Sequence, residues 1–504
     1  MFDNTNTGDQ AGRKPEGADP SLWNADLAAT GVAARQWDWR AISALWVGMV
    51  ICVPTYLLAG SLVSEGMAWW QAILTILLGN CIVLVPMMLL GHAGAKHGIP
   101  FPVLLRASFG TIGARIPALA RGLVACGWFG INTWVGGSAI YVIFNNLFGG
   151  IFTGTPLPLL GIDLFQTVSF LLFWVIHLWF IRHGTESIRW LETLAAPFLL
   201  LMGLALLIWA YINAGGFGEM LSAPSQFVEG GAKAGQFWAV FFPSLTAMVG
   251  FWATMALNIP DFTRFAKSQK DQFIGQSLGL PLPMAFFAFI GVAVTSATVT
   301  IFGEAIWDPV QLAGRMGGLT TVVTLFGLVI ATLTTNLAAN VVAPAHGFSN
   351  LAPSRISFRM GGYITAGIGI AIFPWKLLET AGGYLFTWLV GYSALLGPIA
   401  GIMLADYFFV RRTELEITEL YKRDGIYGTN GGWNVAGLLA LVLGVAPSLP
   451  GFLHAAGFVD TVPAFFDAIY AYAWFVGLFV GGAAYLILRR VGQIEPLAAR
   501  APGE

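Results

Sequence analysis

The chain has 504 residues, of which 57% are hydrophobic and only 10% are charged, and its formal net charge is −1. A soluble globular domain is about 25% charged, so this composition excludes an ordinary soluble enzyme, and the high apolar content excludes a disordered chain. The net charge also argues against nucleic-acid binding, which needs a basic face. The composition therefore predicts an all-α polytopic membrane protein.

Apolar stretches long enough to cross a bilayer recur along the whole chain. They predict twelve transmembrane helices, near residues 41–63, 69–91, 117–145, 163–183, 193–213, 238–260, 279–302, 319–341, 361–375, 378–404, 434–449 and 467–488. We expect loosely ordered tails at 1–40 and 489–504, a core of ten helices at 41–404, and a loop with helices 11 and 12 at 405–488.

Basic residues are distributed unevenly over the predicted tails and loops. Of the 25 Lys and Arg residues, 22 fall on one side of the predicted membrane, and only Lys233, Arg315 and Lys376 fall on the other. Cytoplasmic loops carry the excess of Lys and Arg in membrane proteins. The pattern therefore predicts that both termini are cytoplasmic, in a multi-pass protein of the plasma (inner) membrane.

Two predicted helices carry helix-breaking residues. The first contains Gly48 and Pro54, and the sixth contains Gly250 and ends at Pro260. Proline removes a backbone donor and clashes with the preceding turn. Interrupted helices at corresponding positions of two halves indicate a binding site near the middle of the membrane in transporters, but Gly and Pro also simply kink membrane helices. Both interpretations are open on the breaks alone.

No Asp or Glu lies in the middle of a predicted helix. Carboxylates within the membrane mark proton relays and ion paths, and a membrane-embedded enzyme needs positioned acid and base groups. An ion channel needs a ring of pore-lining groups or a filter, which the sequence does not display. The pattern disfavours a pump, a channel and an enzyme, and it favours a ligand without a full charge.

Neutral polar and aromatic residues lie in mid-span instead. Trp128 and Asn132 are one helical turn apart in the third helix, as are Asn336 and Asn340 in the eighth. A Trp with an amide on the same face is suited to stack on a flat ring and bond its edge, and Trp252 is positioned to supply the opposing face. Trp also forms interfacial belts, and Asn joins helices, so the structural interpretation stays open for each residue.

Histidine and cysteine are not expected to form a metal site. His92 and His97, in a predicted cytoplasmic loop, lack the company of further ligands. We expect His177 in the fourth helix to be a hydrogen-bonded structural residue. Of the three cysteines, we expect Cys52 to line the break in the first predicted helix. We expect Cys81 and Cys126 to pack against other helices.

Three longer strings resemble those of the nucleobase–cation symporters, which carry allantoin, hydantoins, uracil, cytosine and related rings. They are GHAGAKHGIPFPV at 91–103, NIPDFTRF at 258–265 and LGPIAGIMLADYF at 396–408. The resemblance runs from about residue 24 to 490, and the bacterial allantoin and hydantoin permeases are the most similar branch. It implies a transport core at 41–404 with a five-plus-five inverted repeat, and interrupted helices 1 and 6.

The resemblance also implies roles for individual residues. In the family the substrate ring lies between a Trp of helix 3 and a Trp of helix 6, with amides of helices 3 and 8 on its edge. The implied substrate-binding residues are Trp128, Asn132, Trp252, Asn340 and Cys52, the last standing where the family often has an amide. The implied sodium ligands are the carbonyls or hydroxyls of Gly48, Ile51, Ala331, Thr334 and Thr335.

The implied function is secondary active transport, with cation-coupled uptake of a neutral nucleobase-like ring by alternating access. Some family members run on protons, so the coupling ion is sodium or a proton. The alternative is a uracil, pyrimidine or purine base permease driven by protons, and a channel or membrane-embedded enzyme is a remote alternative. No catalytic residue, cofactor, nucleic acid or obligatory protein partner is implied, and the expected partners are a heterocyclic substrate and the lipid bilayer.

Overall fold

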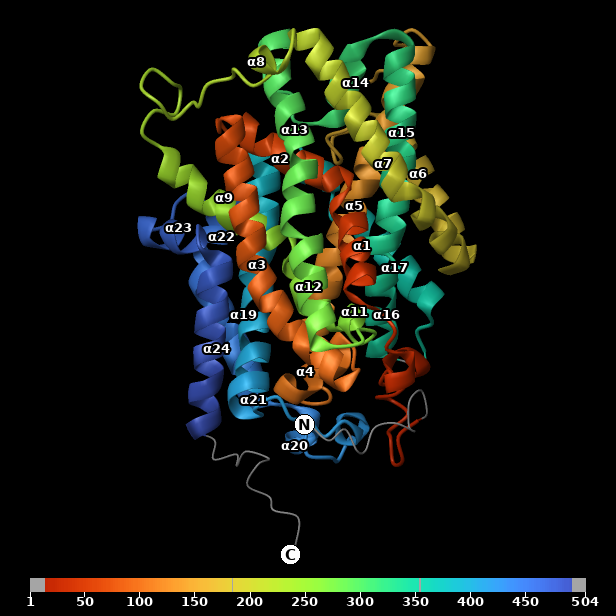
Figure 1. The fold of residues 1–504 in the computed structure, drawn as a ribbon, viewed down its shortest axis with the longest axis vertical. Helices are drawn as coiled ribbons and strands as arrows, with labels where there is room; N and C mark the ends of the chain where they lie inside the picture. The colour runs from red at the N-terminus through yellow and green to blue at the C-terminus, as the bar shows by residue number, and fades with distance from the viewer. Residues whose placement is uncertain (1–13, 184, 353–354, 492–504) are drawn as a thin grey trace, which may run out of the picture.

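The computed structural model describes residues 14–183, 185–352 and 355–491 (Figure 1). Within these ranges all regular structure is helical, apart from one isolated parallel bridge between Trp37 and Ala266. The long helices run side by side, roughly along the longest axis of the molecule. This arrangement confirms the predicted all-α class.

The described ranges contain nine helices that are long and apolar enough to cross a bilayer, and the bent pair α1 and α2 adds a tenth span. The fifth predicted helix corresponds to α7, which contains the shorter apolar stretch Phe198–Ala214, and the ninth corresponds to the 14-residue helix α17. The twelve predicted helices are therefore all present. At 14 residues α17 is shorter than the about 20 residues that a bilayer-spanning helix needs.

The spans in chain order are α1 with α2 (Trp39–Val50, Val53–Ser64), α3 (Trp69–His97), α5 (Arg115–Leu147), α6 (Leu164–His183), α7 (Thr185–Ala214), α9 with α10 (Phe237–Phe251, Ala253–Asn258), α12 with α13 (Gln269–Gly279, Pro281–Phe302), α15 (Gly318–Asn340), α17 (Phe358–Ala371), η3 with α19 and η4 (Gly383–Leu389, Val390–Leu404, Ala405–Val410), α21 with η6 and α22 (Val435–Val445, Ala446–Ser448, Leu449–Ala455), and α24 (Ala473–Val491).

Shorter helices connect the spans: η1 (Ala25–Leu27), η2 (Val32–Ala34), α4 (Phe101–Phe109), α8 (Phe217–Met220), α11 (Pro260–Thr263), α14 (Pro309–Met316), α16 (Val342–Leu351), α18 (Pro374–Leu377), η5 (Thr418–Tyr421), α20 (Thr429–Gly432) and α23 (Ala464–Tyr470).

The first transmembrane helix is interrupted between α1 and α2, whose axes differ by 58°. Ile51 has φ −81° and ψ 82°, and Cys52 is extended with φ −149° and ψ 160°. Pro54 is the second residue of α2, a position where its missing N–H removes no helical hydrogen bond. The proline predicted to break this helix therefore starts its second half.

The sixth helix is interrupted more mildly. α9 ends at Phe251 and α10 begins at Ala253, so Trp252 stands between them with a non-helical φ of −99° and ψ of 6°. Pro260 then begins the short helix α11. The predicted interruptions of the first and sixth transmembrane helices are therefore confirmed, and their positions fit the predicted layout of two five-helix halves.

Several predicted boundaries differ from the structure. The seventh span begins at Gln269 rather than near residue 279, and helical backbone continues through η4 to Val410 instead of ending at 404. The first part of the predicted loop from His92 to Phe101 is instead the end of α3, which is capped by Gly98 with a left-handed φ of 71°. Hydropathy detects only the apolar part of a helix, whereas the helix itself continues until a capping residue ends it.

The N-terminal segment 14–38 packs against one end of the bundle. Leu22 and Leu27 are only 2% and 4% exposed. The Tyr421 hydroxyl donates to the Leu27 carbonyl at 2.6 Å, and the Arg35 guanidinium donates to the carbonyl of Ala95 at 3.0 Å. The expectation of a loosely ordered tail is wrong for these residues, because their anchors are isolated contacts without the periodicity that sequence analysis detects.

The described chain enters and leaves the bundle at the same end. α1 begins and α24 ends at the same end, the lower one in Figure 1, while α8 and α14 lie at the other. At the basic-poor end Lys233 pairs with Glu65 at 2.8 Å, and Arg315 pairs with Glu304 at 2.6 Å. The assignment of the lower end to the cytoplasm stays a prediction.

Candidate functional site

Trp128, on α5, is buried in a group of aromatic side chains from α9, η3 and α19. Its ring centroid lies 5.4 Å from that of Phe251, 5.9 Å from Trp388 and 6.2 Å from Tyr384, all edge to face. Tyr392 lies 6.3 Å away, with Trp388 one turn before it on the same helix. Tyr384 and Trp388 belong to the π-helical segment η3, a form that is frequent at functional sites.

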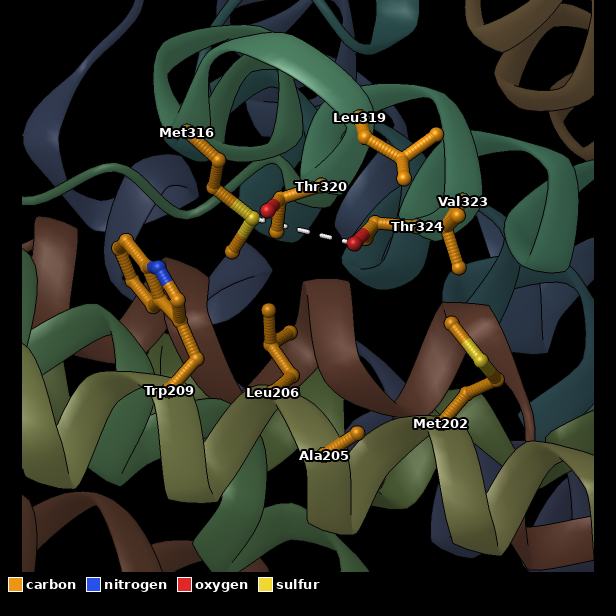
Figure 2. A pocket seen from close by; sticks show the side chains of 9 residues that line it. All are labelled: Met202, Ala205, Leu206, Trp209, Met316, Leu319, Thr320, Val323 and Thr324. Atoms are coloured by element: carbon orange, nitrogen blue, oxygen red, sulfur yellow. Dashed lines mark hydrogen bonds between the residues drawn. The ribbon is translucent and has the colours of Figure 1, made fainter.

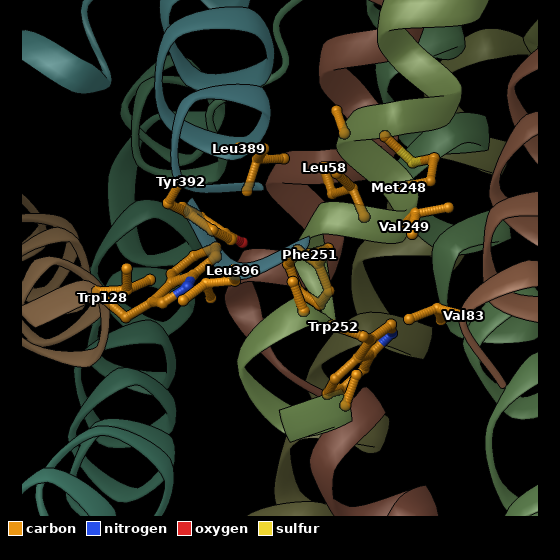
Figure 3. Close-up of a cluster of buried hydrophobic side chains, with 14 of the residues drawn as sticks. Leu58, Val83, Trp128, Met248, Val249, Phe251, Trp252, Leu389, Tyr392 and Leu396 are labelled. Carbon is orange, nitrogen blue, oxygen red and sulfur yellow. The ribbon is translucent and has the colours of Figure 1, made fainter. Parts of the chain in front are cut away.

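Trp252 lies on the far side of Phe251 from Trp128 (Figure 3). Its ring centroid is 5.0 Å from that of Phe251 and 5.2 Å from that of Trp46, again edge to face. The two predicted stacking residues therefore flank one phenyl ring. All four side chains are at least nine-tenths buried, so this aromatic row belongs to the interior of the protein.

Asn132 lies one turn beyond Trp128 and is 1% exposed. Its Nδ2 donates to the Trp128 carbonyl at 3.0 Å, whereas its Oδ1 accepts no hydrogen bond within the described chain. The indole nitrogens of Trp252 and Trp388 are also buried without a partner there. The Trp46 indole nitrogen and the Tyr392 hydroxyl of the same group are likewise without a described partner. Buried polar atoms are normally paired, so this aromatic group carries several polar atoms that are available to a polar ligand.

Asn340, the last residue of α15, is half-buried and belongs to a polar cluster. Its Nδ2 donates to Asn336 Oδ1 at 3.0 Å. Asn336 Nδ2 in turn lies 3.1 Å from the Phe129 carbonyl and 3.1 Å from His177 Nε2. The described contacts of Asn340 therefore lead to α5 and α6 through Asn336, and the structure does not join it directly to Trp128 or Trp252.

His177 is a hydrogen-bonded structural residue, as predicted. Its Nδ1 bonds the Phe173 carbonyl at 2.9 Å, and its Nε2 faces the Asn336 amide. His92 Nδ1 lies 2.9 Å from the Tyr407 hydroxyl, and His97 Nε2 lies 2.9 Å from the Thr413 carbonyl. The described residues contain no group of three His, Cys, Asp or Glu side chains suited to a metal.

Cys52 lies in the break between α1 and α2 and is 4% exposed. Its sulfur is 3.3 Å from the Thr55 hydroxyl oxygen, and that hydroxyl also lies 3.6 Å from the sulfur of Met284. Cys126 is buried, but Cys81 is exposed on α3. The expectation that Cys81 packs against another helix is wrong, since its side of α3 faces outward.

The break in helix 1 releases backbone carbonyls. In a continuous helix the N–H of Cys52 would bond to the Gly48 carbonyl, and that of Thr55 to the Ile51 carbonyl. Here Cys52 N bonds to the Val50 carbonyl and Thr55 N to the Cys52 carbonyl, each at 3.1 Å. Unwound carbonyls of this kind coordinate sodium in transporters, so the local backbone fits the predicted ligand role of Gly48 and Ile51.

The predicted ligands on α15 are close to the break but are not assembled into one site with all of helix 1. Ala331 and Val53 line one small cavity of about 60 Å³, and the Thr334 hydroxyl donates to the Ala331 carbonyl at 2.9 Å. Thr335 is half-buried. Gly48 is exposed, and a Cβ there would meet no neighbouring described element within 4 Å. Helix 1 is therefore not pressed against α15 at Gly48.

A larger cavity of about 330 Å³ lies elsewhere, between α7 and the α14–α15 region (Figure 2). Met202, Leu206 and Trp209 line it from one side, and Met316 and Thr324 from the other. Leu319 and Val323 on its rim are 77% and 55% exposed. Its mainly apolar lining and exposed rim suit the hydrocarbon of the bilayer rather than a polar ring.

Sequence reasoning missed several members of the aromatic group, namely Trp46, Phe251, Tyr384, Trp388 and Tyr392. One signal was present, because Trp388 and Tyr392 are spaced by one helical turn like Trp128 and Asn132. The chain has 19 Trp and 38 Phe, however, so such spacings also occur by chance. Only the packing of α1, α5, α9 and the η3–α19 helix against one another selects these side chains.

Comparisons with known proteins agree with this architecture. A family model described as "Permease for cytosine/purines, uracil, thiamine, allantoin" matches residues 30–477. The chain is 48% identical to the purine-uracil permease NCS1 of Arabidopsis thaliana, over 94% of this chain and 79% of the relative. It is 40% identical to the allantoin permease of Bacillus subtilis, over 95% of both chains.

The fold is similar to a solved structure of the inward-facing conformation of Mhp1. The TM-score is 0.76 and the sequence identity 27%, with 94% of this chain and 96% of that chain covered. The family match, the two relatives and the twelve-helix fold all lead to the same assignment. The protein is a secondary transporter for nucleobase-like compounds and belongs to the family of permeases for cytosine/purines, uracil, thiamine and allantoin.

Proposed function

We propose that the protein takes up a neutral heterocyclic ring of the uracil, purine or allantoin type, coupled to a cation, by alternating access. The observation that carries this proposal is the set of unpaired buried polar atoms in the aromatic group that holds Trp128 and Trp252, which includes Asn132 Oδ1, Trp252 Nε1 and Trp388 Nε1. A lactam or ureide ring offers N–H and C=O groups on its edge and a flat face, so it would satisfy both the polar atoms and the aromatic surfaces.

The two tryptophans would supply most of the affinity for the ring. Stacking of a base on an aromatic side chain contributes about 1–3 kcal/mol. Asn132 would accept a hydrogen bond from a ring N–H, because its own nitrogen is already committed to the Trp128 carbonyl. A ring without such an N–H would leave the buried oxygen unpaired, at a cost of about 1–3 kcal/mol. This difference is the proposed basis of selectivity.

Asn340 and Cys52 are proposed to complete the substrate site. The half-buried Asn340 would reach the ring edge while Asn336 holds its amide nitrogen, and this needs movement of α15 relative to α5. Cys52 would face the ring from the helix 1 break, with Thr55 beside its sulfur. A thiol is a weak donor and acceptor, so this position would tolerate varied ring substituents.

The coupling ion would bind between the α1–α2 break and α15. Its ligands would be the carbonyls or hydroxyls of Gly48, Ile51, Ala331, Thr334 and Thr335. Movement of Gly48 toward α15 would complete this site. The ion would therefore favour the conformation in which α1 and α15 are in contact. A ligand shifts a conformational equilibrium only by its differential affinity for the two states. We propose residues 41–404 as the moving core, with both termini in the cytoplasm.

The test is uptake into proteoliposomes that hold the purified protein. Labelled uracil and allantoin are offered under an inward sodium gradient, an inward proton gradient, or neither, with Trp128→Ala as the inactive control. Saturable uptake driven by one gradient supports the proposal and identifies the ion. Uptake that rises linearly with concentration, equal in wild type and Trp128→Ala, would refute a binding site at Trp128.

A further inference from the structure

The phenyl ring of Phe251 occupies the space between the two tryptophans that are proposed to hold the substrate ring. It meets Trp128 at 5.4 Å with an interplanar angle of 80°, and Trp252 at 5.0 Å with an angle of 87° (Figure 3). Its side chain is 6% exposed. A phenyl ring has the size and flatness of a six-membered heterocycle, so it fills the same kind of space.

The aromatic group to which Phe251 belongs carries buried polar atoms that a phenyl ring cannot pair. Asn132 Oδ1, next to Trp128, and Nε1 of Trp252 and Trp388 are buried and unbonded in the described structure. A hydrocarbon ring gives these atoms nothing to bond to, and unpaired buried polar atoms are unfavourable. Phe251 therefore satisfies the shape of this site and leaves its chemistry unsatisfied.

The backbone at Phe251 provides a way to move the ring. Phe251 is the last residue of α9, and the next residue, Trp252, has non-helical backbone angles. The Trp252 N–H bonds to the Val249 carbonyl at 3.3 Å, three residues back, rather than to the carbonyl four residues back as in an α-helix. A side chain at such a break can change direction without unwinding a regular helix.

We propose that Phe251 is a built-in substitute for the substrate ring, which fills the site when it is empty and is displaced when substrate binds. This inference rests on the proposed function and adds a selectivity step to it. A ring displaces Phe251 only if its hydrogen bonds to Asn132 and the indole nitrogens outweigh the contacts that Phe251 loses. Apolar rings of the same shape gain no such bonds and are excluded.

Displacement lowers the measured affinity in a predictable way. The apparent dissociation constant equals the intrinsic one divided by the fraction of molecules whose site is free. If Phe251 fills the site in about nine-tenths of the molecules, removing it tightens binding about 10-fold. Replacing Phe251 by a smaller side chain therefore increases affinity, whereas the loss of an ordinary packing residue leaves affinity unchanged or weakens it.

The first experiment measures equilibrium binding of labelled uracil and allantoin to wild type, Phe251→Leu and Phe251→Ala in nanodiscs. Phe170→Leu is the matched control, because Phe170 is a buried phenyl ring that also contacts two tryptophans, Trp134 at 6.1 Å and Trp375 at 5.6 Å. We expect about 10-fold tighter binding for the Phe251 variants and no tightening for the control. Unchanged or weaker binding in both Phe251 variants would overturn the inference.

The second experiment observes the ring directly. It keeps a side chain of nearly the same size at position 251, so it does not depend on the protein tolerating a smaller one. 4-Fluorophenylalanine is incorporated at position 251 or, in a separate sample, at position 170, and ¹⁹F NMR spectra are recorded with and without saturating uracil or allantoin. We expect the resonance at 251 to move to a new position and the one at 170 to stay. Identical spectra at 251 would contradict displacement.

The two proposals fail in different ways. If wild type binds neither uracil nor allantoin, the proposed function fails, and the role of Phe251 fails with it. If wild type binds a ring and Trp128→Ala does not, but the Phe251 variants bind no more tightly and the ¹⁹F signal does not move, only the inference about Phe251 is refuted.

Discussion

The side-chain nitrogen of Asn132 donates to the main-chain carbonyl of Trp128, 3.0 Å away, so the Asn132 oxygen is the free end of the amide. One helical turn thus supplies both a ring surface and an acceptor with a defined direction. The direction matters because it selects ligands with an N–H on the ring edge over ligands with only acceptors there.

Asn132→Leu removes this acceptor while keeping the size of the side chain. We expect ring binding to weaken about 10-fold, since leaving a buried ring N–H unpaired costs about 1–3 kcal/mol and 1.4 kcal/mol corresponds to a factor of about ten. Asn80→Leu is a matched control, because the Asn80 nitrogen bonds to the Ile76 carbonyl at 2.7 Å and its oxygen is likewise buried and unpaired. Equal losses in both variants, measured by binding, would show a structural role only.

Trp128→Ala and Asn340→Ala should each abolish saturable uptake while the protein remains in the membrane. The first removes one stacking surface, and the second removes the proposed amide of helix 8. Trp179→Ala serves as the control, because Trp179 is 54% exposed on α6 and faces away from the interior. Uptake assays with membrane-protein quantification decide this, and wild-type affinity in either site variant would remove that residue from the site.

Thr335→Ala tests the proposed ion site. If the ion is sodium, the variant should need a higher sodium concentration for half-maximal uptake, because one hydroxyl ligand is lost next to Thr334 and Ala331. Thr320 lies on the same helix but lines the larger cavity between α7 and α15, so Thr320→Ala should leave the sodium requirement unchanged. Uptake that ignores sodium and collapses with an uncoupler would instead indicate proton coupling.

Cys52 should be a thiol that substrate protects. Only the thiolate reacts with maleimides, and the Cys52 sulfur is buried beside Thr55, so labelling should be slow. Saturating substrate should slow it further in a Cys81→Ala, Cys126→Ala background, in which the exposed Cys81 cannot contribute. Cys52→Asn should shift ring preference by adding a donor and an acceptor. Equal labelling rates with and without substrate would place Cys52 outside the site.

Membrane orientation can be tested with alkaline phosphatase fusions, which are active only outside the cytoplasm. A fusion near Lys233 should be active, and one near Lys267 should be inactive, because the basic residues gather on the side of Lys267. The reverse pattern would mean that the whole bundle is inverted, whereas activity at both positions would mean that α9 and α10 do not cross the membrane.

Composition and hydropathy along the chain determined the class and the twelve helices, and Gly48 and Pro54 indicated the interruption of the first one. These features are local, because each span must satisfy its own backbone within the bilayer and each proline acts on its own turn. The pairing of Trp128 with Asn132 was also readable, since residues four apart on a helix share a face. The capped helix end at Gly98 and the packing of segment 14–38 could not be predicted from the sequence, because hydropathy does not report hydrogen bonds.

Only the tertiary structure decided what surrounds Trp128. The helices α9, η3 and α19 bring Phe251, Trp388 and Tyr392 to Trp128 from distant parts of the chain. Their local sequence alone does not single these residues out among the many aromatic residues of the chain. The structure likewise connected Asn340 to Asn336 and His177 and left Gly48 exposed. Such contacts depend on how helices pack against one another, and small residues at helix contacts set that packing in a membrane, where the hydrophobic effect does not.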